Sequence, residues 1–307
     1  MTQDTSSNCV MPRQLPKGTI DTHFHLFGPE CFFPYDTERS YTPNDVNSVS
    51  YSLLAKTLGI SRAVIVQPSV YGTDNRRLLN GLVEFDFDIR GVVVIDETIS
   101  DDELMKMHEM GVRAIRINLV FRAGVGFKTA ILLAPRLKDL GWHIQFFVDV
   151  SSWPEMIEIV EKICVPVIFD HVGYVQAKCT TGNKGFNDLL SLMKEELAWV
   201  KLSGIYRMTN AFVQAPYLDV RPFVDAVISA NRSIKGWITV RFVLYATLLT
   251  INLEEILQIS SFGSKPLATN VLPVSTMSTI RCANCITGAS SKAPVSLIMS
   301  IWMPLSA

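Results

Sequence analysis

Short apolar runs rich in β-branched residues alternate from residue 19 onward with longer segments of helical period. Strands that are apolar on both faces are typical of a parallel sheet covered by helices. A parallel sheet requires a crossover segment between successive strands, and the longer segments can supply it. The pattern predicts strands at residues 19–25, 62–67, 89–95, 112–118, 143–149, 166–170 and 199–203, and leaves room for an eighth strand near Trp237.

Helix start signals lie between these runs. Ser100 and Glu103 have the spacing of a capping box, and Ser152 and Glu155 repeat it, with a proline near the first helical position. Further helices are predicted at residues 187–196 and from Arg221 to about residue 230. Strand and helix therefore alternate along the chain.

This alternation fits a doubly wound sheet or a closed barrel. No Gly-x-Gly-x-x-Gly or Walker-type loop follows a strand, so the usual marker of a nucleotide-binding sheet is missing. The strand count favours an α/β fold of the (β/α)8 TIM-barrel type, and 307 residues suffice for one such barrel with extensions. In that fold the chemistry lies at the carboxyl ends of the strands.

The charge balance excludes some partners. With 28 Lys and Arg against 29 Asp and Glu the net charge is −1, so neither nucleic acid nor an anionic membrane surface is expected as the main partner. The most apolar stretch, residues 242–249, is much shorter than the ~20 residues that cross a bilayer. Six scattered cysteines and a polar N-terminus without a secretory signal favour a reducing, cytoplasmic location.

The composition changes near Lys235. Residues 236–307 contain 6 charged side chains among 72, against 51 among the 235 residues before them, and all 5 histidines lie in the earlier part. We therefore divide the chain into a polar extension at 1–18, a barrel at 19–235 and an atypical tail at 236–307. Cys282 and Cys285 in the tail have the spacing of half a zinc ribbon or of a thioredoxin-like redox motif, but the second pair and the strand-to-helix context are missing, so we expect neither there.

Three histidines lie at the carboxyl ends of predicted strands. His23 and His25 end the first strand, and alternation places them on one face of it. His171 follows the sixth strand. Imidazoles at one rim of a barrel can hold a metal or polarise a carbonyl group, although His-x-His can also be two ordinary strand residues. The remaining two, His108 in a predicted helix and His143 at the opposite end of a strand, are expected to be structural.

Arginines gather at the same predicted rim. Arg116 ends the fourth strand, Arg122 follows it, and Arg207 follows the seventh. Guanidinium groups match carboxylates, so the three together would clamp an anionic substrate, whereas each alone can also form a surface ion pair. Ser69 and Tyr71, after the second strand, could add hydrogen bonds to a ligand.

Several motifs, in order, carry a family resemblance. They are Asp21–Pro29, Phe33–Arg39, Tyr41–Pro43, Val66–Gln67, Asp74–Asn75, Gly111–Asn118 and Asp170–Gly173. Together they resemble the amidohydrolase-related (amidohydrolase 2) family, and within it the branch of 2-pyrone-4,6-dicarboxylate lactonases. The resemblance covers roughly residues 17–235.

This resemblance implies a hydrolase that opens a carboxylated lactone of the 2-pyrone-4,6-dicarboxylate kind, in the catabolism of aromatic compounds. His23, His25 and His171 would polarise the lactone carbonyl and stabilise charge on its oxygen. No cofactor is implied, although zinc-dependent decarboxylases of the wider family suggest Zn²⁺ on the same histidines as an alternative. The substrate contacts implied by the resemblance are Arg116, Arg122, Arg207, Tyr41 and Ser69.

The chain departs from the lactonase pattern in two places. Tyr174-Val175 stands where the pattern has Arg-Pro, so one substrate contact is lost. In the eighth strand the family carries an aspartate as the general base, but no aspartate follows Lys235 here. We interpret residues 236–307 as a product of a frameshift or unspliced intron. A barrel that has become a binding protein for aromatic acids or lactones is the alternative.

Overall fold

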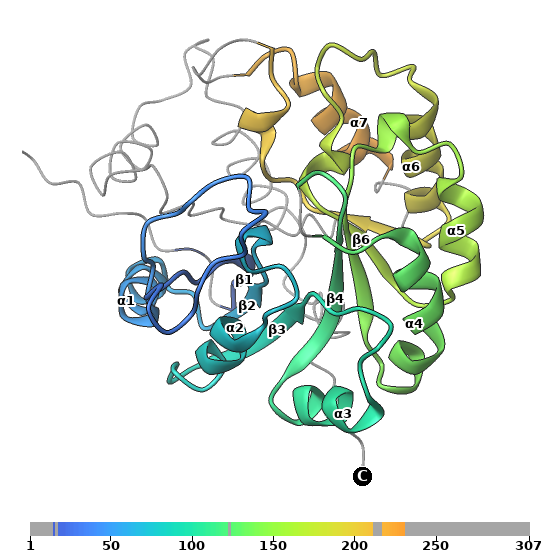
Figure 1. Ribbon diagram of the computed structural model, residues 1–307. Coiled ribbons are helices and arrows are strands. Elements are labelled where there is room, and N and C mark those ends of the chain that lie inside the picture. The colour runs from blue at the N-terminus through green and yellow to red at the C-terminus, as the bar shows by residue number, and fades with distance from the viewer. Residues whose placement is uncertain (1–14, 16–17, 122–123, 211–216, 231–307) are drawn as a thin grey trace, which may run out of the picture.

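The computed structural model describes residues 15, 18–121, 124–210 and 217–230, and within them a parallel sheet runs through the molecule. Its seven strands are hydrogen-bonded in sequential order. Figure 1 shows helices arranged around the outside of this curled sheet. The strands are β1 (Ile20–Phe24), β2 (Arg62–Val66), β3 (Asp88–Val93), β4 (Val112–Asn118), β5 (His143–Phe147), β6 (Val167–Phe169) and β7 (Ala198–Val200).

Each pair of successive strands is joined by a segment that includes a helix. The helices are α1 (Ser48–Leu58), α2 (Arg76–Gly81), α3 (Asp101–Glu109), α4 (Phe127–Asp139), α5 (Met156–Ile163), α6 (Lys184–Lys194) and α7 (Arg221–Ala230). Single 3-10 turns follow several strand ends: η1 (Ser69–Tyr71), η2 (Val150–Ser152), η3 (His171–Tyr174) and η4 (Ile205–Arg207). In the described part, no helix is long and apolar enough to cross a membrane.

All seven predicted strands are confirmed, most of them one or two residues shorter than the apolar runs. The α/β class and the sequential parallel order are consistent with a TIM-barrel-like fold, and the contact between Lys201, which follows β7, and His23 in β1 shows that the sheet curls. The predicted eighth strand near Trp237 lies outside the described residues, as do Cys282 and Cys285.

One of the two predicted capping boxes is confirmed and the other is not. The capping box is confirmed at α3, where Ser100 accepts from the Glu103 amide and the Glu103 carboxylate accepts from the Ser100 amide. The second capping box is wrong: α5 begins at Met156, and the Ser152 hydroxyl instead donates to the backbone oxygen of Asp149. Helix α6 begins before the predicted residue 187, because the Asn183 side chain caps it.

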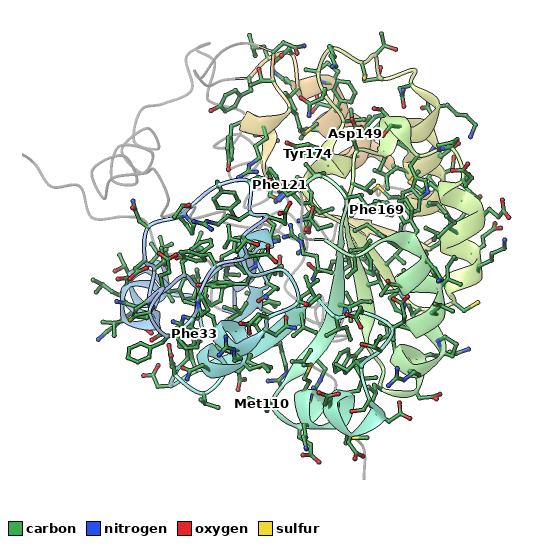
Figure 2. The ribbon with its side chains drawn as sticks, in the orientation of Figure 1. Phe33, Met110, Phe121, Asp149, Phe169 and Tyr174 are labelled. Carbon is green, nitrogen blue, oxygen red and sulfur yellow. The ribbon has the colours of Figure 1, made fainter. Side chains whose placement is uncertain are left out.

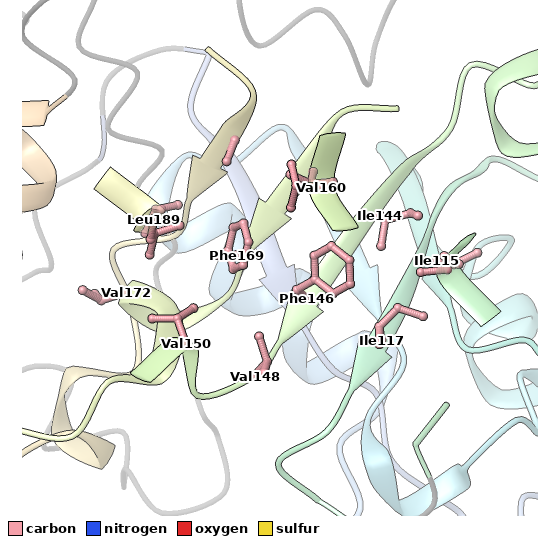
Figure 3. Close-up of a cluster of buried hydrophobic side chains, with 14 of the residues drawn as sticks. Ile115, Ile117, Ile144, Phe146, Val148, Val150, Val160, Phe169, Val172 and Leu189 are labelled. Carbon is pink, nitrogen blue, oxygen red and sulfur yellow. The ribbon is translucent and has the colours of Figure 1, made fainter. Parts of the chain in front are cut away.

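Alternation along the strands directs side chains to the outer and the inner face of the sheet. Outward side chains pack against the helices, as Figure 3 shows for Ile115 and Ile117 of β4 and for Ile144 and Phe146 of β5. Inward side chains form a second small apolar cluster, consisting of Val64, Val66, Val92 and Ala114. Toward the carboxyl ends of the strands the inward positions become polar, and these positions carry the candidate site.

Candidate active site

Three histidines meet at the carboxyl ends of β1 and β6. His23 is fully buried, and its ring centre lies 4.9 Å from that of His25 and 5.4 Å from that of His171. The expectation that His-x-His on β1 would face the histidine after β6 is therefore met in geometry. The chemical roles given to these residues stay predictions.

The ring of His25 has a defined hydrogen-bond direction. Its Nδ1 lies 2.6 Å from the backbone oxygen of Val66, which can only accept, so Nδ1 carries the hydrogen. Burial lowers the pKa of His25 to about 3, and the nearby Arg116 charge acts in the same sense. In its neutral form His25 therefore has its lone pair on Nε2, and this atom can accept a hydrogen bond.

An unusual backbone turn places His171. The residues of η3 all have positive φ, which is rare for residues with side chains and is typical of strained functional sites. In this conformation Nδ1 of His171 lies 2.8 Å from the hydroxyl of Ser203. Gly204 makes room for the ring, since a Cβ there would lie 2.7 Å from His171 Cγ. Burial lowers the pKa of His171 to about 3, so the imidazole is neutral.

Asp170 is the anion at the centre of the cluster. Arg116 donates from Nε and Nη2 to its Oδ2 at 3.0 and 2.8 Å, and Lys201 Nζ lies 3.0 Å from its Oδ1. Burial alone would raise the pKa of Asp170, but the charges of Lys201 and Arg116 hold it well below its usual range. The carboxylate is ionised and is shared by two cations.

Lys201 and Gln145 were not predicted as site residues. The Lys201 ammonium donates to Oε1 of Gln145 at 2.7 Å and lies 3.0 Å from Nδ1 of His23. The amide of Gln145 in turn lies 3.2 Å from Nε2 of His143. A lysine between Val200 and Leu202 in an apolar run was the available signal, because alternation directs it to the face opposite its neighbours.

The other two histidines have different surroundings. His143 begins β5, at the end opposite the mouth, but it is linked to the site through Gln145. His108 lies in α3 and accepts from Trp142 Nε1 at 2.9 Å, away from the cluster. Its structural assignment is consistent with this contact.

Asp21 holds β1 in position. Its carboxylate accepts from the backbone amide of His23 and from the hydroxyl of Tyr51 in α1. Burial raises the pKa of Asp21 to about 7. The strand end that presents the histidines is thus fixed by hydrogen bonds to both the backbone and a helix.

Aromatic rings connect the histidines to the predicted substrate arginines. The Phe147 ring lies 5.1 Å from that of His171 and 4.8 Å from the Arg116 guanidinium carbon. Phe121 and Tyr174, labelled in Figure 2, contact Phe147 at 5.6 and 5.0 Å between ring centres.

Four of the predicted substrate contacts lie within the described residues: Arg207, Tyr41, Ser69 and Arg116. Arg207 packs its guanidinium 5.7 Å from the centre of the Phe121 ring, and the centre of the Tyr41 ring lies 6.0 Å from that of Phe121. Burial raises the pKa of Tyr41, while a hydrogen bond with Ser69 opposes this shift. Arg116 is buried, and bonds to Asp170 and to the Gln67 backbone oxygen use three of its five N–H donors.

Arg122 lies outside the described residues. The structure thus brings Arg116, Arg207, Tyr41 and Ser69 to the same mouth as the histidines. Whether any of them binds a substrate carboxylate stays a prediction.

The donor set was compared with the needs of a divalent metal. His23, Asp170 and His171 each offer a ligand atom, and these atoms lie within 4.8 Å of one another. However, the Lys201 ammonium lies 3.0 Å from both His23 Nδ1 and Asp170 Oδ1. A positive charge at that distance repels a dication, and Arg116 already neutralises the carboxylate. The residues therefore fit Zn²⁺ poorly.

Comparison with known proteins places this site in a family. The amidohydrolase family profile matches residues 20–231, which include all the site residues named above. The chain belongs to the amidohydrolase family. This amidohydrolase is 33% identical over 225 residues to a 2-pyrone-4,6-dicarboxylate hydrolase of Comamonas testosteroni, covering 70% of this chain and 73% of the relative.

Two further relatives agree in chemistry and fold. A 4-sulfomuconolactone hydrolase of Rhizobium radiobacter is 31% identical over 72% of this amidohydrolase and 75% of the relative. Among solved structures, a Pseudomonas putida protein assigned as a 2-pyrone-4,6-dicarboxylic acid hydrolase is 30% identical, with a TM-score of 0.59 over 70% of this chain and 77% of that chain. The relatives are enzymes that act on lactones.

Proposed function

We propose that this amidohydrolase hydrolyses a carboxylated lactone similar to 2-pyrone-4,6-dicarboxylate, without a metal ion, in a (β/α)8 barrel. The observation that carries the proposal is the set of three imidazoles beside Arg116 and Arg207, of which His23 and His171 are buried and His25 is partly buried. The low pKa values of His25 and His171 mean that these two rings are neutral at physiological pH. Uncharged rings next to guanidinium groups suit a substrate that brings its own negative charge.

In this proposal one ring nitrogen accepts a hydrogen bond and another donates one. The lone pair on His25 Nε2 can hold the attacking water, and an imidazole N–H can stabilise negative charge on the carbonyl oxygen as water adds. The water oxygen bonds to the carbonyl carbon, the ester bond from this carbon to the ring oxygen breaks, and the leaving oxygen takes the proton that the water loses, so that the product is a hydroxy acid or its keto form. Arg207, with Tyr41 and Ser69, would bind a substrate carboxylate at the aromatic side of the mouth.

The missing eighth-strand aspartate favours one other function. In the described part the central carboxylate, Asp170, is paired with two cations and cannot readily take the proton of a water. A chain without a strong base would bind the lactone and turn it over slowly, since loss of a general base costs ~10²–10⁴-fold in rate. A lactone-binding protein is therefore the second candidate function.

A single comparison tests both functions. The loss of absorbance of 2-pyrone-4,6-dicarboxylate is followed with this chain, with a version whose eighth strand carries Asp-x-Pro-His, and with each after His25→Gln. Turnover by the repaired form that His25→Gln reduces supports the hydrolase. Saturable binding by dialysis without turnover in either form supports the binding protein, and neither binding nor turnover contradicts both.

The tail carries a proposal of its own. The fall in charged residues after Lys235 coincides with the end of the family match at residue 231. We propose that 236–307 come from a shifted frame or an unspliced intron. Sequencing of transcript-derived DNA across codons 230–260 tests this, and peptides from 236–307 found in the native host would contradict it.

A further inference from the structure

The Lys201 side chain joins strands that lie far apart in the sequence. It is 3% exposed, and its ammonium contacts Nδ1 of His23 in β1, Oε1 of Gln145 in β5 and Oδ1 of Asp170 after β6. The contacts with His23 and Gln145 are hydrogen bonds, whereas the contact with Asp170 is an ion pair. The ammonium is therefore held in place by residues of three different strands.

This contact decides where His23 carries its hydrogen. A lysine ammonium has no lone pair, so Nδ1 of His23 must be the acceptor at 3.0 Å. A neutral imidazole has one N–H, which then lies on Nε2. The arrangement opposes the ordinary preference, because Asp170 Oδ1 lies only 3.6 Å from the same Nδ1 and a carboxylate there usually attracts the N–H.

We propose that Lys201 is a positioning residue that fixes His23 in the tautomer with its hydrogen on Nε2, and so makes this ring a hydrogen-bond donor for the substrate. The catalytic part of this inference rests on the proposed lactone chemistry, whereas the tautomer of His23 follows from the contacts alone. His23 would then complement His25, whose hydrogen lies on Nδ1 and whose Nε2 accepts.

Gln145 helps to hold the Lys201 ammonium beside His23. Its Oε1 accepts from the ammonium, and its amide nitrogen then donates to Nε2 of His143 at 3.2 Å. The two contacts fix which end of the amide faces Lys201. Arg116 pairs with the other oxygen of Asp170, so the charge of this carboxylate is balanced by two cations without His23.

The tautomer is measured by nitrogen NMR of protein labelled with ¹⁵N-histidine, with the His23 signals assigned from a His23→Gln variant. In the parent protein the hydrogen is expected on Nε2. In Lys201→Met, whose unbranched side chain is one atom shorter and carries no charge, it is expected to move to Nδ1, toward Asp170. Lys201→Arg retains a cation and should keep the hydrogen on Nε2.

The control is Lys162→Met, which makes the same change at an exposed ion pair with Glu158. It should leave the His23 signals unchanged. A hydrogen on Nδ1 in the parent protein overturns the proposal even if Lys201→Met fails to fold. A hydrogen that stays on Nε2 in a folded Lys201→Met also overturns it.

Kinetics provide a second readout if the lactone is turned over. Loss of one donor to the carbonyl oxygen costs about 10²–10³-fold in kcat, and KM should change far less because the substrate carboxylates bind elsewhere. Lys201→Arg should recover part of kcat. An unchanged kcat in Lys201→Met overturns the catalytic role, whereas absence of turnover in the parent protein counts against the lactonase and leaves the NMR result standing.

Discussion

Arg116 of β4 donates two hydrogen bonds to one oxygen of Asp170, which follows β6, and both side chains are almost completely buried. The pair holds the carboxylate below the histidines and lets Lys201 occupy its second oxygen. Removing one partner of a buried ion pair leaves an uncompensated charge, which is far more costly than losing a surface pair. The stability of the sheet and the shape of the site are thus linked at this contact.

We expect Arg116→Met to lower the free energy of unfolding by about 3 kcal/mol, measured by urea denaturation. Arg221→Met is the matched control, because Arg221 pairs with Asp225 on the exposed face of α7. That change should cost about 0–1 kcal/mol. Equal losses in the two variants would show that the buried pair adds nothing.

Gly204 and Gly141 allow a test of how His171 is placed. Both glycines have φ near +65°, but a Cβ at Gly204 meets the His171 ring whereas nothing lies within 4 Å at Gly141. Alanine at either position should cost ~1–2 kcal/mol of backbone strain. Only Gly204→Ala should also displace the imidazole and weaken lactone binding or turnover. Equal ligand affinity in both variants would contradict this account of the turn.

The pH dependence of stability should include a contribution from His108. Burial lowers its pKa below 6.5, and the nearby Arg113 charge acts in the same sense. As the pH falls below about 6.5 the unfolded state takes up a proton before the folded state does, so stability decreases. Urea unfolding between pH 7.5 and 5.5 should show a smaller decrease for His108→Gln. An NMR pKa of His108 at or above 6.5 would rule this contribution out.

Arg207 is a predicted carboxylate contact at the aromatic side of the mouth, where its guanidinium packs against the Phe121 ring. A hydrogen bond to a charged group contributes ~1.5–3 kcal/mol, so Arg207→Met should raise KM or Kd for a dicarboxylate lactone by about tenfold or more. The control is Arg76→Met, an exposed arginine that pairs with Asp74. Isothermal titration of 2-pyrone-4,6-dicarboxylate checks both, and a Kd unchanged in Arg207→Met removes this residue from the site.

The strand pattern predicted much of the site because it depends on local alternation. Once the parallel strands were located, their carboxyl ends identified His23, His25, His171 and Arg116. The second capping box failed for a local reason as well, since Ser152 had a nearer partner in the backbone of Asp149. Helix α6 began early because Asn183, rather than a serine or threonine, supplied the cap.

The residues that were missed depend on contacts between distant strands. Asp170 was visible in its motif, but its two cations come from β4 and from the end of β7. Lys201 was treated as an ordinary strand residue, because its apolar neighbours indicate only which face it lies on, whereas its partners come from β1, β5 and the end of β6. Its partner His23 lies 178 residues earlier in the chain.

The sequence by itself determined the order of strands and helices, the histidines at the strand ends and the resemblance to lactone hydrolases, because these follow from periodicity and motifs along the chain. Only the tertiary structure decided how those groups are charged and which ring atoms carry hydrogen. Curling of the sheet brings the Lys201 side chain, which follows β7, to His23 in β1, and burial there makes each polar atom depend on a partner from another strand. That is why Lys201, and no local feature near His23, determines what the His23 ring can donate.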